Sequence, residues 1–151
     1  MSCVRSVFSL LLTTAFLLTG HGLHMTFLPL MASEIGLSQT VIGLSGSAYF
    51  VGFISGALVT PHIIAKVGHI RSFTTLMAVF LCCFQVLPMS DAGWVWILAR
   101  FLLGAVMCGA YTVVESWLSD QADSRSHGRV LGIYTLVVLA AMAAGQGILG
   151  L

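Results

Sequence analysis

One arginine of this chain lies inside an apolar stretch, where a charge is costly. Arg100 is eight residues into the stretch from Ala92 to Leu118, or about 12 Å from its start at 1.5 Å per residue. An arginine at the centre of a membrane helix costs about 2.5 to 3.5 kcal/mol, so we expect its side chain to face a bundle interior or a watery cavity. The functional interpretation is substrate binding or proton coupling. The alternative is a structural arginine that joins neighbouring helices through their carbonyl groups.

Two histidines, His21 and His24, are three residues apart and therefore share one face of a helix. His21 and Arg100 lie at similar depths, about 21 Å and about 18 Å from the same membrane surface. If both helices face one cavity, His21, His24 and Arg100 form a cluster suited to an anionic group or a proton relay, with Gln146 as a further hydrogen-bonding candidate. Alternatively, His24 is merely wet at the interface and Gln146 bridges two helices. No metal is expected, because no third ligand accompanies the pair.

Glu115 lies near the end of the same apolar stretch as Arg100, where a carboxylate opposes the negative end of the helix dipole and needs a partner. The candidate partners are Lys66, Arg71, Arg125 and Arg129, and Gly68 provides a permissive turn between the first two. We therefore expect an inner-face network of these residues that holds one conformation. The alternatives are a snorkelling surface acid and a loop that only controls topology.

The composition excludes a soluble domain. Of the 151 residues, 58% are hydrophobic and 7% are charged, against about 25% charged in soluble domains. Lipid or other membrane helices must therefore surround most of the surface. The net charge of +1 leaves no basic field for nucleic acid. The cysteines lack metal or disulfide spacing and no catalytic motif is present, so we expect no enzyme, no cofactor and no metal site.

Five apolar stretches are each near or above the roughly 20 residues that cross a bilayer. They predict an all-α membrane protein with transmembrane helices at residues 7–32, 41–65, 72–89, 92–118 and 130–151. The short connections make consecutive helices antiparallel neighbours, and we predict a single domain over residues 1–151. Small residues indicate close helix packing in the second, fourth and fifth stretches, at Gly43, Gly46, Gly52, Gly56, Gly104, Gly109, Ala140, Ala144, Gly145, Gly147 and Gly150.

The basic residues outside these stretches fall in segments that share one side of the membrane. Arg5 precedes the first stretch, Lys66 and Arg71 follow the second, and Arg125 and Arg129 follow the fourth. Lysine and arginine in short loops remain in the cytoplasm, so we predict a cytoplasmic amino terminus. The first stretch lacks a signal-peptide cleavage site, and we expect it to be retained. Because the chain stops inside an apolar segment after an odd number of helices, we expect a fragment or a truncated reading frame.

The loop between the second and third stretches carries a recognisable pattern. Lys66 and Gly68 match the first basic position and the second glycine of the signature G-x-x-x-D-R-x-G-R-R, whereas Pro61 and Ala65 replace its first glycine and its acidic residue. This loop resembles the signature of the major facilitator superfamily of transporters. The superfamily implies transport of a small solute rather than catalysis.

The fourth and fifth stretches extend this resemblance. Arg100 followed by Gly104 is similar to the R-x-x-x-G pattern of the superfamily's fourth helix, a position that the family associates with proton coupling. Glu115 and the segment 128–132 resemble the acidic residue that ends this helix and the basic loop after it. Three short segments look closest to the YcaD-like branch of bacterial members, namely Ser47-Ala48-Tyr49-Phe50, Val114-Glu115-Ser116-Trp117 and Gly145-Gln146.

The resemblance implies twelve helices in two six-helix halves, with the substrate site at mid-membrane between them. This chain would then be part of the amino-terminal six-helix bundle, its first and fourth helices would line the cavity, and a missing carboxyl-terminal half would complete the site. We expect a proton-linked or facilitative secondary transporter that works by alternating access in a bacterial inner membrane. The alternative is a truncated non-transporting membrane fragment or a small membrane interaction subunit. An enzyme would need a catalytic domain encoded downstream.

Overall fold

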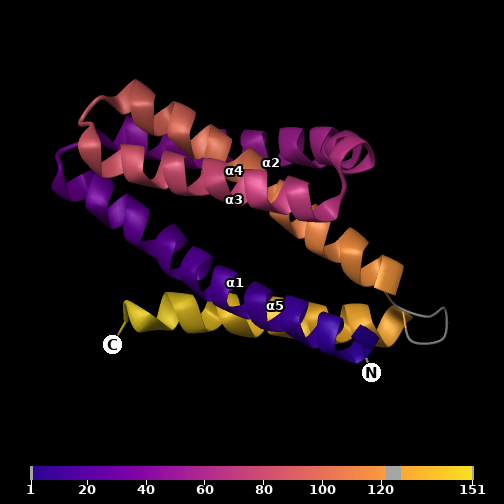
Figure 1. Cartoon of the computed structure of the whole chain (residues 1–151). Helices are drawn as coiled ribbons and strands as arrows, with labels where there is room; N and C mark the ends of the chain where they lie inside the picture. The colour runs from indigo at the N-terminus through magenta and orange to yellow at the C-terminus, as the bar shows by residue number, and fades with distance from the viewer. Residues whose placement is uncertain (1, 122–126, 151) are drawn as a thin grey trace. The chain divides into compact units, whose positions relative to one another are not determined.

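In a computed structural model, the chain folds into long helices joined by short turns. The structure describes residues 2–121 and 127–150, and the side chains of residues 8–121 and 127–150. The elements in chain order are α1 (Ser2–Glu34), α2 (Gln39–Val67), α3 (His69–Val86), the 3-10 turn η1 (Leu87–Met89), α4 (Gly93–Gln121) and α5 (His127–Ile148), as Figure 1 shows. Within the described residues, five helices are long and apolar enough to cross a membrane. The prediction of an all-helical fold with five membrane spans is confirmed.

The chain divides into two compact units. The first comprises Met1–Met31 and Glu115–Leu151, and the second comprises Ala32–Val114. Both boundaries fall inside helices, so α1 and α4 each contribute to both units. The expected single domain over residues 1–151 stays a prediction.

A glycine turn ends α1 and allows the chain to reverse into α2. Gly36 has a φ of 81°, which side chains with a Cβ atom rarely adopt. Its N–H donates to the Ser33 carbonyl at 3.1 Å, and the Leu37 N–H donates to the Ala32 carbonyl at 3.0 Å. This pair of hydrogen bonds is the Schellman arrangement, which satisfies carbonyl groups at the end of the helix.

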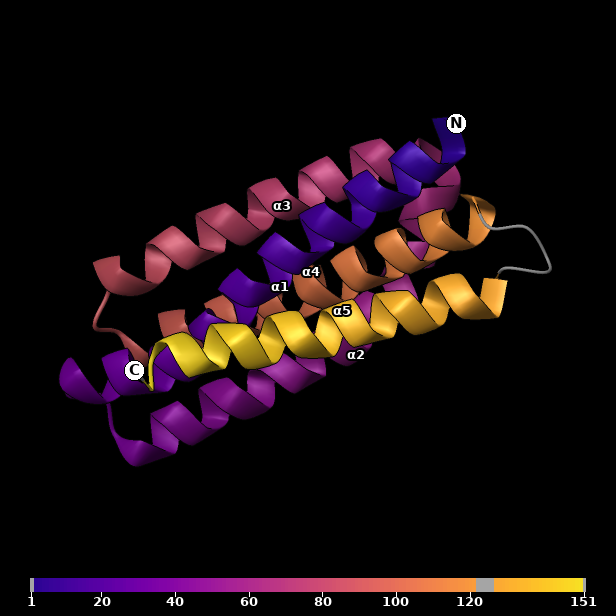
Figure 2. The same ribbon diagram turned by 90° about the horizontal axis from the view of Figure 1, so that it is seen from below.

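In the first unit, α1 and α5 run side by side (Figures 1 and 2). A Cβ atom added to Gly22 of α1 would overlap the backbone of Met142 in α5. A Cβ atom added to Gly145 would likewise overlap the α1 backbone at Thr19 and Leu23. The two helices therefore meet backbone to backbone, which only glycine permits.

In the second unit, α2 and α4 make the same kind of contact. Added Cβ atoms at Gly52 and Gly56 of α2 would overlap the α4 backbone at Phe101 and beyond, and one at Gly104 of α4 would overlap the α2 backbone at Tyr49. Other glycines face open space, so the abundance of small residues overstates the number of contacts. Gly43, Gly46 and Gly147 have no neighbour within 4 Å at the position of a Cβ atom.

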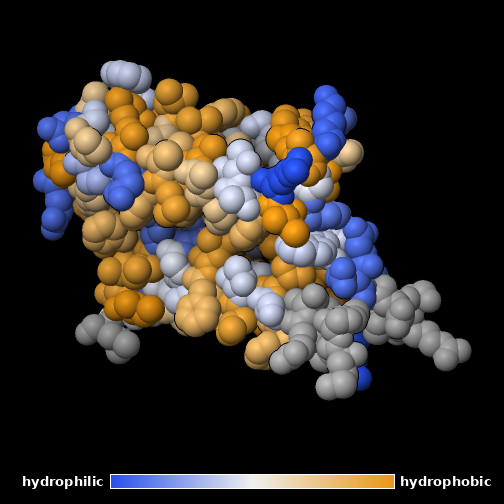
Figure 3. All heavy atoms as spheres, viewed as in Figure 1, coloured by the Kyte–Doolittle hydropathy of each residue, from blue (hydrophilic) through white to orange (hydrophobic). Residues whose placement is uncertain are grey.

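Hydroxyl side chains inside the spans bond within their own helices. The Thr14 hydroxyl donates to the Leu10 carbonyl at 2.8 Å, and the Thr19 hydroxyl donates to the Ala15 carbonyl at 2.8 Å. Because each donor finds a carbonyl about one turn earlier, these residues need neither water nor another helix. Large apolar side chains lie exposed elsewhere on the spans, and apolar residues cover much of the face in Figure 3. This surface is suited to lipid.

Two glycines of α2 provide a matched test of the backbone contact. Gly52→Ala should lower the free energy of unfolding by about 1–3 kcal/mol, because the new methyl group overlaps the α4 backbone. Gly46→Ala, which enters open space, should leave that free energy unchanged or raise it by up to about 1 kcal/mol through helix propensity. Unfolding in detergent micelles, followed by circular dichroism, measures both. Equal losses in the two variants would contradict the contact.

Candidate functional site

Arg100 occupies a buried position in the most buried of the five spans. It lies two turns into α4, and its side chain is 5% exposed. The neighbouring Trp96 is also buried, and its indole N–H donates to the Ser90 carbonyl at 2.8 Å, which fastens the start of α4 to the preceding turn. Burial agrees with the expectation that this arginine avoids lipid.

A tyrosine from α2 holds the Arg100 guanidinium. The guanidinium carbon lies 5.2 Å from the centroid of the Tyr49 ring, and Tyr49 is itself 3% exposed. At this distance a cation is attracted to the negative face of the ring. The glycine contact places the ring there, because Gly104 lets α4 touch the α2 backbone at Tyr49 itself. Sequence reasoning missed Tyr49 as a site residue, since no spacing along one helix identifies a partner on another.

Further aromatic rings extend from Tyr49 along the α2 and α4 contact. The ring of Phe53 lies 6.3 Å from that of Tyr49, and the ring of Tyr111 lies 6.2 Å from that of Phe53. Both separations fall within the range of attractive aromatic pairs. The site in the second unit is therefore one buried cation beside a row of aromatic rings.

His21 and His24 lie together in the first unit. Their ring centroids are 6.3 Å apart, and both side chains are buried. Gly22, between them, meets the Met142 backbone of α5, so the pair lies beside a backbone contact of the two helices. Arg100 belongs to the second unit. A cavity common to His21, His24 and Arg100 thus stays a prediction.

Gln146 follows the packed glycine of α5, and its side chain is exposed. A role for Gln146 in the cavity also stays a prediction. Among the described residues, no group of three or more histidine, cysteine, aspartate or glutamate side chains is arranged to hold a metal ion.

Glu115 interacts with a residue that sequence reasoning did not consider. That residue is Tyr134, a buried residue of α5, whose side chain lies near the exposed Glu115 carboxylate. Both residues belong to the first unit. Arg129 lies five residues before Tyr134 on α5 with its side chain exposed, and Arg125 lies outside the described residues.

Gly68 forms the turn between α2 and α3. Its φ is 83°, its N–H donates to the Ile64 carbonyl at 2.8 Å, and its carbonyl accepts a hydrogen bond from the Ser72 hydroxyl at 2.7 Å. Lys66 and Arg71 on either side are exposed. The turn therefore presents two exposed cations, one at the end of α2 and one near the start of α3. Their participation with Glu115 and Arg129 in one network stays a prediction.

The contact between Arg100 and Tyr49 can be tested through stability. Tyr49→Leu removes the ring and should lower the free energy of unfolding by about 2 kcal/mol or more, whereas Tyr49→Phe keeps the ring and should cost less than about 1 kcal/mol. A double-mutant cycle that combines Tyr49→Leu with Arg100→Met measures how much of the lost free energy of unfolding comes from the interaction between the two residues. Phe50→Leu, at an exposed ring on the same helix, is the control. Additivity of Tyr49→Leu and Arg100→Met would contradict the interaction.

Comparison with known proteins agrees with this architecture. Residues 10–151 match the sequence profile of the Major Facilitator Superfamily. The chain is 31% identical over 121 residues to proteins named "Uncharacterized MFS-type transporter YcaD" from Escherichia coli O139:H28 (strain E24377A / ETEC) and from Escherichia coli O9:H4 (strain HS). Each alignment covers 80% of this chain and 32% of the relative, so the chain spans about a third of the length of these relatives. No solved structure matches.

The family match covers nearly the whole described chain, and the membrane-length helices fit it. The resemblance found in the loop around Gly68 and in α4 is thereby confirmed. This multi-pass membrane protein belongs to the Major Facilitator Superfamily.

Proposed function

We propose that the chain forms part of a secondary transporter that moves a small solute across a bacterial inner membrane by alternating access. The observation that carries the proposal is Arg100, a cation 5% exposed inside a membrane-length helix. Charged residues inside spans are costly and rare, and they mark substrate or proton pathways. The remaining two-thirds of a protein the size of the relatives would supply the other half of the transporter.

We assign the substrate or proton cavity to Arg100, His21, His24 and Gln146. Arg100 would bind the anionic group, and the buried histidines would accept or release protons, as imidazoles do near neutral pH. Protons are therefore a candidate coupling ion, and facilitated transport without an ion is the other mode. The single-domain assignment of residues 1–151, as part of an amino-terminal six-helix bundle, belongs to the same proposal.

We assign an inner-face gate to Lys66, Gly68, Arg71, Glu115 and Arg129. The Gly68 turn joins the two helix ends that carry Lys66 and Arg71, and Tyr134 lies near Glu115. Ion pairs among such groups would stabilise one conformation and break in the other, which is how a gate biases two states.

The transport role predicts a specific loss when Arg100 is changed. A chimera in which residues 1–151 replace the matching segment of YcaD is reconstituted into vesicles that contain the pH dye pyranine, and a panel of small carboxylates and neutral solutes is added. For any solute that drives proton movement, Arg100→Gln should lower the rate about tenfold or more, because a buried charge-assisted hydrogen bond is lost. Radiolabelled uptake of the same panel covers transport without protons.

Gln85→Ala, at an exposed polar side chain of α3, is the control and should transport normally. Transport rates are compared at equal protein abundance. If the chain is instead a non-transporting fragment or an interaction subunit, Arg100→Gln should change the abundance of the protein and leave the transport rate unchanged. Equal rates for Arg100→Gln and Gln85→Ala would contradict the assignment.

The proposed orientation places the amino terminus and the Gly68 turn in the cytoplasm, because the basic residues outside the spans gather on that side. In a chain whose native cysteines are replaced by alanine, Glu34→Cys should react with an impermeant maleimide in intact cells. Ile70→Cys, also exposed, should react only after permeabilisation. The reverse pattern would overturn the orientation.

A further inference from the structure

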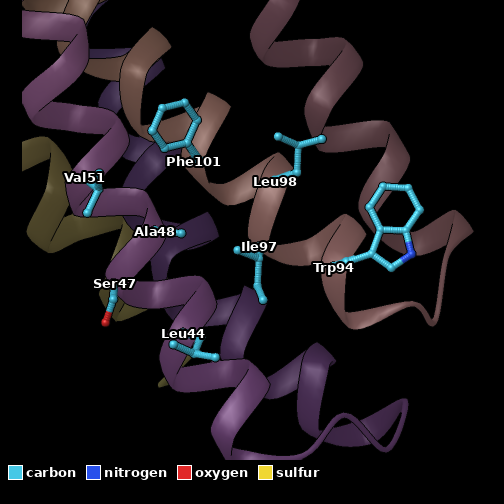
Figure 4. A pocket seen from close by; sticks show the side chains of 8 residues that line it. All are labelled: Leu44, Ser47, Ala48, Val51, Trp94, Ile97, Leu98 and Phe101. Carbon is cyan, nitrogen blue, oxygen red and sulfur yellow. The ribbon is translucent and has the colours of Figure 1, made fainter.

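Two apolar grooves flank one exposed ridge at the start of α4. The first groove, of about 540 Å³, lies between α2 and α4, and Figure 4 shows its lining side chains on both helices. The second, of about 310 Å³, lies between α3 and α4. Trp94 and Leu98 line both grooves, so these two residues form the ridge between them.

The grooves begin at the same end of the helices and extend to the same depth. Gly93 lies against the Val41 side chain, which brings the start of α2 to the start of α4. The grooves then follow α4 from Trp94 to Phe101 and Leu102, about 12 Å at 1.5 Å per residue. One leaflet of a bilayer has a hydrocarbon depth of about 15 Å. Each groove thus matches an acyl chain of a single leaflet in depth.

The grooves are continuous with the exposed apolar surface of the spans. Trp94 is 70% exposed and Leu98 is 52% exposed, and Leu44 and Val51 on α2 and Val86 on α3 are exposed as well. In a multi-pass membrane protein such a surface meets hydrocarbon, and two parallel apolar grooves suit the two chains of a phospholipid. Trp94 between them has the amphipathic ring that favours the headgroup boundary.

A carboxylate, Asp91, lies just before the start of α4, where both grooves begin. Asp91 is exposed three residues before Trp94, and the hydrogen bond from Trp96 to Ser90 fixes the turn that carries it. A carboxylate there repels an anionic headgroup and attracts an ammonium group.

We propose that the Trp94 and Leu98 ridge seats one zwitterionic phospholipid, with an acyl chain in each groove and its headgroup ammonium beside Asp91. This inference goes beyond the proposed transport function and does not depend on it. Lipid bound in this way would hold the starts of α2 and α4 and the end of α3 together at the membrane surface.

Native mass spectrometry of the whole chain, released from nanodiscs that contain equal phosphatidylethanolamine and phosphatidylglycerol, tests the proposal. We expect one retained phospholipid per chain, with the ethanolamine lipid favoured about threefold or more. Ala48→Trp fills the first groove, whose wall includes Ala48, and should lower retention about fivefold. Ala57→Trp, at an exposed alanine on the same helix, should retain lipid normally.

Asp91→Asn should abolish the headgroup preference while lipid remains bound.

Trp94→Ala provides a second variant that leaves the core intact, since the side chain is largely exposed, and it should also lower retention. Absence of stoichiometric lipid in the unaltered chain would overturn the proposal. Equal lipid retention in Ala48→Trp and Ala57→Trp would also overturn it. Equal lipid retention in Trp94→Ala and the unaltered chain would do the same. A lipid-free dimer whose formation Ala48→Trp prevents would assign the grooves to a second copy instead.

Discussion

Backbone contact at glycine is the interaction on which the second unit depends. Lipid is as apolar as the helices, so two helices gain little from burying side chains against each other and associate where their backbones approach closely. Gly52, Gly56 and Gly104 supply this approach between α2 and α4. The position of Arg100 over Tyr49 follows from it, because a wider separation would move the ring away from the guanidinium.

The spans could be predicted from the sequence because the length of an apolar run decides whether a helix crosses the membrane. A run of about 20 apolar residues fills the bilayer, and in lipid every backbone group must bond within its own helix. The helices nevertheless extend into polar residues at several ends, as α1 does to Glu34. Hydrogen bonding at Gly36 decides that end rather than hydrophobicity. The position of the Gly68 turn was also predictable, because a short loop between long helices needs a residue that tolerates positive φ.

The partners of the site residues could not be predicted in this way. Spacing along one helix shows that His21 and His24 share a face and that Arg100 needs a partner, but Tyr49 and Tyr134 lie on other helices. Their selection depends on how two helices cross. The glycines illustrate the same limit, because Gly46 and Gly52 lie in the same apolar stretch and only Gly52 meets another backbone. The apolar grooves beside Trp94 escaped notice for a related reason, since their walls are ordinary apolar side chains from three helices.

The partner of Arg100 bears on the kind of work this residue can do. A carboxylate beside a buried arginine would neutralise it, and an anionic solute would then have to displace that carboxylate. An aromatic ring attracts the cation without carrying an opposite net charge. Tyr49 therefore orients the guanidinium without contributing an opposite net charge, and Gly104 keeps the ring in place without adding a side chain of its own. In the proposed transport function, a guanidinium oriented by a ring would bind an anion that arrives and leaves.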